Sequence, residues 1–158
     1  MLRPILALLL LPASLHAEVA ASDLRLVAAF PTARSAAIYG MVTNDGPETL
    51  RLIAVESDAG MTMLHETVDE NGVTSMRPVT AVRMPPGSTL TLAPGGVHLM
   101  VMGLAPGALD APLADVTLVF EDGTRVAFPV KVRIGPDDET MHGTEGHTDA
   151  EHGAHGSH

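Results

Sequence analysis

The sequence predicts an all-β domain, an antiparallel β-sandwich or barrel, on the basis of two observations. Short segments with the apolar and polar alternation of strands recur from residue 24 to residue 134, and glycine and proline turns separate them. We find no convincing amphipathic helix between these segments. Many short strands joined by close turns are typical of sandwiches and barrels.

Eight or nine strands are expected. In chain order the candidate segments are residues 24–28, 36–42, 49–55, 61–66, 72–79, 89–92, 98–104, 115–120 and 125–132. The Asn71-Gly72 pair favours a tight hairpin between the fourth and fifth segments, because both residue types accept positive φ angles. Residues 107–114 are expected to form a loop.

The first 17 residues are typical of a secretory signal peptide. Arg3 precedes an apolar run at residues 5–11 that is too short to span a bilayer, and small residues follow. We expect cleavage near Ala17, or as late as Ala20. The alternatives are a short membrane anchor and a buried helix. The mature protein is then expected in the periplasm, without membrane insertion, as one domain over residues 18–134.

Composition changes after residue 134. Residues 135–158 are polar and contain five histidines: His142, His147, His152, His155 and His158. So few apolar residues cannot offset the entropy of ordering, which predicts a disordered tail. Histidine-rich tracts bind metals, and imidazole nitrogens suit Cu(II). An inert solvated tail or an expression tag is the alternative.

Charge and composition exclude several classes of function. The formal charge is −10, from 19 acidic and 9 basic residues, and nucleic acid binding needs clustered Lys and Arg. The absence of cysteine excludes disulfides, a CxxC redox pair, a thiolate zinc site and a blue-copper centre. No catalytic nucleophile with a base, phosphate loop or carboxylate pair stands out, so we expect a binding protein and not an enzyme.

Methionine and histidine alternate along two of the expected strands. Each trio occupies every second position of its segment: Met61, Met63 and His65 in the first, His98, Met100 and Met102 in the second. Each trio should therefore point to one side of its strand. Soft thioether sulfur combined with imidazole favours copper, as Cu(I), over zinc and over hard ions. Methionine is also a flexible core filler, so the pattern alone leaves a structural role open.

A longer pattern spans three segments. They are Met63-Leu64-His65-Glu66, the segment 72–79 with Met76-Arg77-Pro78, and the segment 92–104 with Pro94-Gly95-Gly96 and His98-Leu99-Met100. Over roughly residues 36–132 the chain resembles the periplasmic copper chaperone family PCuAC, whose pattern is a His, ten residues, a Met, twenty-one residues and His-x-Met. His65, Met76, His98 and Met100 satisfy every spacing.

The resemblance implies a cupredoxin-like sandwich that holds Cu(I) with those four residues. It also implies delivery to a copper-accepting protein, either a terminal oxidase subunit or another copper chaperone, and we expect a monomer. Met63 and Met102 lie outside that set and are auxiliary candidates that could shield the site or offer transfer ligands, but we expect them mainly to pack around the site. The alternatives are a copper-sequestering or resistance protein without a dedicated acceptor, and a structural β-sandwich module that binds no copper.

Overall fold

The computed structural model describes residues 19–136, which form ten strands and no helix. The expected signal peptide, and the expected tail beyond residue 136, lie outside the described residues. The strands are β1 (Val19–Ala28), β2 (Ser35–Asn44), β3 (Leu50–Ser57), β4 (Met61–Glu70), β5 (Val73–Pro78), β6 (Val82–Met84), β7 (Thr89–Leu92), β8 (Val97–Met102), β9 (Leu113–Phe120) and β10 (Arg125–Ile134). Residues 19–136 include no helix of the length and apolarity that a membrane crossing requires.

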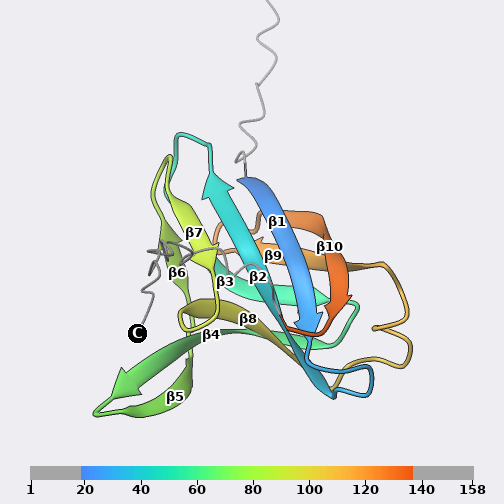
Figure 1. The fold of residues 1–158 in the computed structure, drawn as a ribbon. Helices are drawn as coiled ribbons and strands as arrows, with labels where there is room; N and C mark the ends of the chain where they lie inside the picture. The colour runs from blue at the N-terminus through green and yellow to red at the C-terminus, as the bar shows by residue number, and fades with distance from the viewer. Residues whose placement is uncertain (1–18, 137–158) are drawn as a thin grey trace, which may run out of the picture.

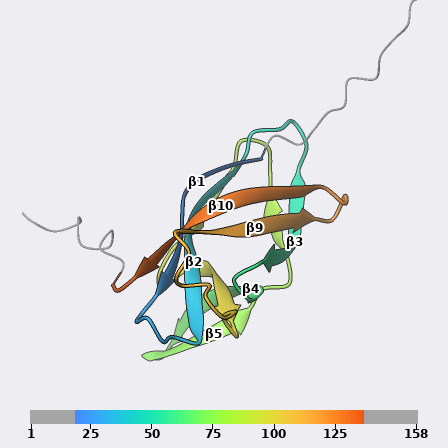
Figure 2. The same cartoon turned by 90° about the vertical axis from the view of Figure 1, so that its right-hand side faces the viewer.

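The ten strands form one curled sheet with the order β5-β4-β8-β2-β1-β10-β9-β3-β6 (Figures 1 and 2). The first half of β2 pairs with β8 and its second half with β7. Within the described residues the pairs are antiparallel except β1 with β10, which join the two ends of the domain in parallel. The edge strands β5 and β6 do not pair with each other, so the sheet is not a closed barrel. The all-β, antiparallel fold is confirmed, with this one parallel pair.

Alternate residues of the strands form a single core inside the curled sheet. Leu26, Ile38 and Phe120, from β1, β2 and β9, are each at most 1% exposed. Burial of one such side chain contributes about 1.5–3 kcal/mol. In β8, Leu99 and Val101 join this core. The residues that alternate with them point to the outer face of the sheet.

A bulge in β1 interrupts its pairing with β2. The register shifts between Ser22 and Arg25, and Asp23 has a positive φ of 53°. Gly40 of β2 faces this bulge, and a Cβ added to it would lie 2.9 Å from the carbonyl oxygen of Asp23. Glycine is therefore required at position 40, because any side chain would collide with backbone atoms.

All nine expected segments form strands, and the remaining differences have local causes. The Asn71-Gly72 hairpin is confirmed, with φ angles of 57° and 80° that match a type I′ turn. The sequence pattern misses β6, because its three residues are too few to show alternation. It also starts β1 at residue 24 instead of Val19, since the first half of β1 carries mostly small side chains.

Asn44, fully buried at the end of β2, connects three segments through its amide group. Its Nδ2 donates to the carbonyl oxygens of Glu48, at 2.7 Å, and Met84, at 2.9 Å. Its Oδ1 accepts from the N–H of Gly46 at 3.1 Å. One side chain thus holds the β2–β3 turn against the end of β6.

We expect Asn44→Ala to lower the free energy of unfolding by about 2–4 kcal/mol, because two carbonyl oxygens lose their donor in a buried place. Urea denaturation measures this change. Glu48→Ala is the matched control, since only the backbone carbonyl of Glu48 is used and the effect should stay within about 0.5 kcal/mol. Equal losses in the two variants would contradict this role of Asn44.

Candidate metal site

The methionine and histidine trios of β4 and β8 lie opposite each other, residue by residue. The antiparallel register pairs His65 with His98, Met63 with Met100 and Met61 with Met102. Directly opposite residues of an antiparallel pair project to the same face with their Cβ atoms about 5 Å apart. The two trios therefore form one ladder on the outer face of the sheet.

The register that creates this ladder is fixed from both sides. On the inner face, Leu64 and Leu99 are paired and are 4% and 1% exposed. At the start of β4, a Cβ on Gly60 would lie only 2.8 Å from the carbonyl oxygen of Met102, so the two chains pass very close there. A slip of one residue would exchange the core face for the outer face.

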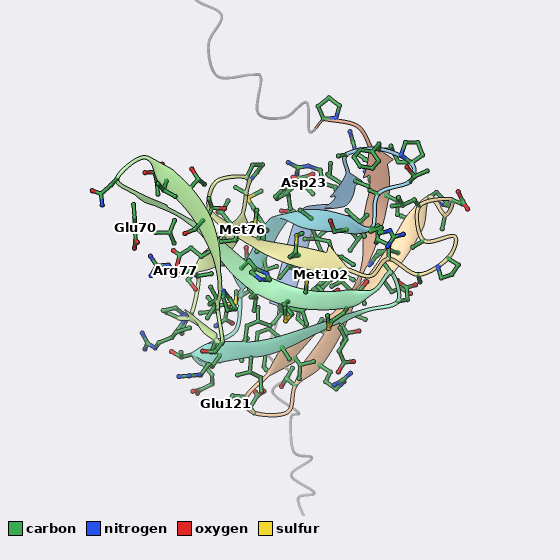
Figure 3. All side chains as sticks on the ribbon, turned by 90° about the horizontal axis from the view of Figure 1, so that it is seen from below. Asp23, Glu70, Met76, Arg77, Met102 and Glu121 are labelled. Carbon is green, nitrogen blue, oxygen red and sulfur yellow. The ribbon has the colours of Figure 1, made fainter. Side chains whose placement is uncertain are left out.

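The edge strand β5 adds Met76 to the same face. Met76 pairs with Thr67, which lies two residues beyond His65 along β4, and His65 itself pairs with Pro78. Figure 3 shows Met76 toward the β4–β5 hairpin and Met102 farther along the strands. The structure thus brings the four ligands expected from the sequence onto one face of three adjacent strands.

The two histidine rings stack, with their centroids 6.2 Å apart and an interplanar angle of 23°. His98 is 4% exposed, and its Nδ1 lies 3.1 Å from the carbonyl oxygen of Gly96. A carbonyl only accepts, so a neutral His98 ring bonds to it only through an Nδ1–H, and that tautomer keeps the lone pair on Nε2. Nδ1 of His65 is buried and has no hydrogen-bond partner among the described residues. Each ring therefore has a nitrogen available to a metal ion.

The methionine side chains of this face do not pack into the hydrophobic core. Met61, Met63 and Met76 are 61%, 38% and 59% exposed, while Met100 and Met102 are half-buried. Large apolar side chains gathered in solvent on one sheet face need a reason other than packing. Within residues 19–136 no three His, Asp or Glu side chains come close enough to hold a metal ion. The donor set is therefore imidazole with thioether, which is soft, and not the oxygen-rich set of a hard ion.

Two neighbours of His98 were not expected from the sequence. Gly96 supplies the carbonyl that orients its ring, and Tyr39 of β2 packs beside it with ring centroids 6.3 Å apart. Nothing in the local pattern of Tyr39 indicates this role, because only the pairing of β2 with β8 brings it there. The five tail histidines lie outside the described residues.

A protein-family model described as "Putative lipoprotein LpqE-like" matches residues 19–132. Among curated proteins, the chain is 43% identical over 99 residues to "Putative lipoprotein Lxx21020" of Leifsonia xyli subsp. xyli (strain CTCB07). That match covers 60% of this chain and 60% of the relative, so the chain spans less than two thirds of the relative's length.

Similar solved structures share the fold. The copper-bound PCuAC domain from PmoF2 has a TM-score of 0.59 and 26% identity, over 75% of this chain and 93% of that domain. The solution structure of CuI-DR1885 from Deinococcus radiodurans has a TM-score of 0.54 and 26% identity, over 70% of this chain and 75% of that one. Apo-DR1885 has a TM-score of 0.56 and 25% identity, over 85% and 95%. These likenesses confirm the cupredoxin-like sandwich.

We expect His98 in the metal-free protein to be the Nδ1–H tautomer, because its Nδ1 faces a carbonyl oxygen that can only accept. Long-range ¹H–¹⁵N correlation spectra of the neutral imidazole, recorded at pH 8, distinguish the two tautomers. An Nε2–H tautomer would contradict the assignment and would leave the wrong nitrogen facing the site.

Proposed function

The chain belongs to the LpqE-like family, and we propose that it is a copper chaperone, which binds Cu(I) on the outer face of β4, β5 and β8 and passes it to an acceptor protein. The proposed ligands are His65, Met76, His98 and Met100. Copper is the cargo of this protein, and its action is binding and transfer without catalysis.

The observation that carries this proposal is the meeting of two imidazoles with available nitrogens and several thioethers on a single sheet face. His65 brings a buried nitrogen without a partner among the described residues, and the carbonyl oxygen beside Nδ1 of His98 favours the tautomer that leaves Nε2 free. A buried polar atom that lacks a partner costs about 1–3 kcal/mol, and a metal bond would remove that cost. Thioether sulfur selects soft Cu(I) among the ions that imidazole binds.

The comparisons support the same conclusion. Two of the solved structures that share this fold at 26% identity are named as a copper-bound domain and as a CuI-containing protein. The ligand spacing that this chain shares with the PCuAC family supports a copper site beside the paired histidines and methionines of β4 and β8. Copper binding by this chain is therefore proposed from its donors, its fold and its relatives together.

The geometry suits release as well as binding. Neutral imidazoles and thioethers leave the bound ion its positive charge, so an acceptor that offers anionic thiolates would bind it more tightly. Met76 and Met63 are exposed, so a partner can approach the metal from the outer face without disturbing the core. Met63 faces Met100 directly and is proposed to assist transfer, with Met102 shielding the far side.

The proposed place of action is the periplasm, after removal of a signal peptide. The family description and the Leifsonia xyli relative carry the word lipoprotein, which fits a protein of the cell envelope. The 158 residues include no cysteine, the residue that S-linked lipids require. The proposed acceptor is the copper centre of a terminal oxidase or another copper chaperone, on the strength of the family resemblance.

We expect Met76→Leu to weaken Cu(I) binding about tenfold or more, because it keeps the size of the side chain and removes its sulfur. Combined alanine substitution of His65, Met76, His98 and Met100 should abolish binding at the folded site. Anaerobic Cu(I) titration against a competing chelator measures both effects, on chains that end after Pro136.

Met41→Leu is the matched control, because Met41 lies on β2 outside the ladder and is 38% exposed, as Met63 is. Its Cu(I) affinity should equal that of the wild type. Equal affinity in Met76→Leu would remove Met76 from the ligand set, and binding that survives the combined substitution would refute the folded site. A copper-sequestering protein would bind equally well, but it would give copper to an apo acceptor no faster than dissociation allows.

We expect the tail to bind Cu(II) independently of the folded site, because its five histidines supply imidazole without thioether neighbours. Equilibrium dialysis of the full chain against a chain ending after Pro136 measures the Cu(II) stoichiometry of the tail. This end point keeps Gly135, whose N–H bonds the carbonyl oxygen of Ala28 at 2.9 Å. Unchanged Cu(II) stoichiometry after truncation would remove the tail from the proposal.

A further inference from the structure

A pocket of about 280 Å³ lies where β1 and β10 begin to pair. The bulge at Asp23 displaces β1, and Pro129 of β10 has no N–H to donate, so the ladder starts only at Arg25 opposite Lys131. The gap combines apolar and cationic side chains. The apolar ones include Leu113 and Phe128, and the cationic ones are Arg25, Lys131 and Arg133.

Two cations of this pocket differ from several arginines of the domain. Lys131 and Arg133 form no ion pair within the part of the chain that the structure describes. Elsewhere three arginines are paired with glutamates: Arg51 with Glu121, Arg77 with Glu70 and Arg125 with Glu56. The hydrogen bond from Arg125 lowers the pKa of Glu56.

The charge of the pocket is opposite to that of the chain. Its lining has three cationic side chains and one carboxylate, that of Asp23, in a protein with a formal charge of −10. Two of the cations, Lys131 and Arg133, are exposed. A local positive potential on an acidic protein attracts and orients anionic groups of a binding partner.

The pocket and the metal site share the outer face of the sheet. Lys131 lies opposite Arg25, and the Arg25 guanidinium lies 5.9 Å from the centre of the Tyr39 ring. That ring packs beside His98, with the two centroids 6.3 Å apart. β10 and β8 are three strand spacings apart, or about 14 Å. A standard interface covers roughly 800 Å² per partner, so one protein can contact both features.

We propose that this pocket is the docking point for an acidic segment of the protein that exchanges copper with the site, an inference that rests on the proposed function. Carboxylates of the partner pair with Lys131 and Arg133, and an apolar residue beside them enters the gap near Phe128. The pairing fixes the partner on the face where Met63 and Met76 are exposed. The pocket thereby determines the orientation of the bound partner, and none of its residues is a proposed copper ligand.

The test uses the full metal-free chain and a labelled, acetylated and amidated hexapeptide of alternating Glu and Leu as the probe. Fluorescence anisotropy at low ionic strength measures its affinity. We expect Lys131→Ala/Arg133→Ala to weaken binding about tenfold or more, because hydrogen bonds between charged groups are lost. Arg83→Ala removes an exposed arginine of β6 and is the matched control, which should bind as the wild type does. A second peptide, in which Gln replaces each Glu, carries no charge and should not bind.

Three results would overturn the docking site. The first is an affinity of the double variant for the probe that equals the affinity of Arg83→Ala. The second is binding of the Gln–Leu peptide as tight as that of the Glu–Leu peptide. The third is displacement of the probe by free acetate or glutarate with an affinity equal to that of the probe. The last would assign the pocket to a small carboxylate. Cu(I) titration of the double variant should give the wild-type stoichiometry. A wild type that binds the probe and no Cu(I) would refute the proposed function while leaving the pocket as an acidic-segment site.

Discussion

The candidate site depends on one constraint, the register of β4 on β8. This register places His65 opposite His98 and Met63 opposite Met100, and it is maintained on the other face by the burial of Leu64 and Leu99. Side chains alternate along a strand, so core packing and the paired histidines and methionines of the outer face are two consequences of the same alignment. The close passage of Gly60 and the backbone of Met102 adds a steric limit at one end. The site therefore needs no loop to assemble it, because three neighbouring strands position its candidate donors.

Periodicity allowed the sequence to predict the strands, the hairpin at Asn71 and the common face of each trio. The four-residue ligand pattern came from family resemblance, because spacing along a chain does not reveal which strands are neighbours. For the same reason Tyr39 and Gly96, both beside His98, could not be found in advance. β6 was missed because three residues carry too little pattern. The parallel pairing of β1 with β10 depends on contacts between the two ends of the domain, which local sequence does not encode.

The chemistry of the outer face differs between the proposed metal site and the proposed docking pocket. At β4, β5 and β8 the donors are uncharged and soft, which favours an ion that can be given up again. At β1 and β10 the side chains are cationic, and in a protein of charge −10 they define a direction for an approaching anionic partner. Tyr39 stands between the two regions, in contact with His98 on one side and Arg25 on the other.

All six residues of β5 are exposed, and among residues 19–136 the strand pairs only with β4. It contributes no side chain to the core, so its detachment from the sheet costs little more than its ladder of backbone hydrogen bonds. Met76 thus belongs to a segment of low local stability, while His65 and His98 belong to the well-packed centre. An ion bound by Met76 and the two histidines would connect β5 to this well-packed centre and would stabilise the attachment of the strand. Detachment of β5 from β4 would then be the first step of copper release. The rest of the fold would stay intact during this local opening.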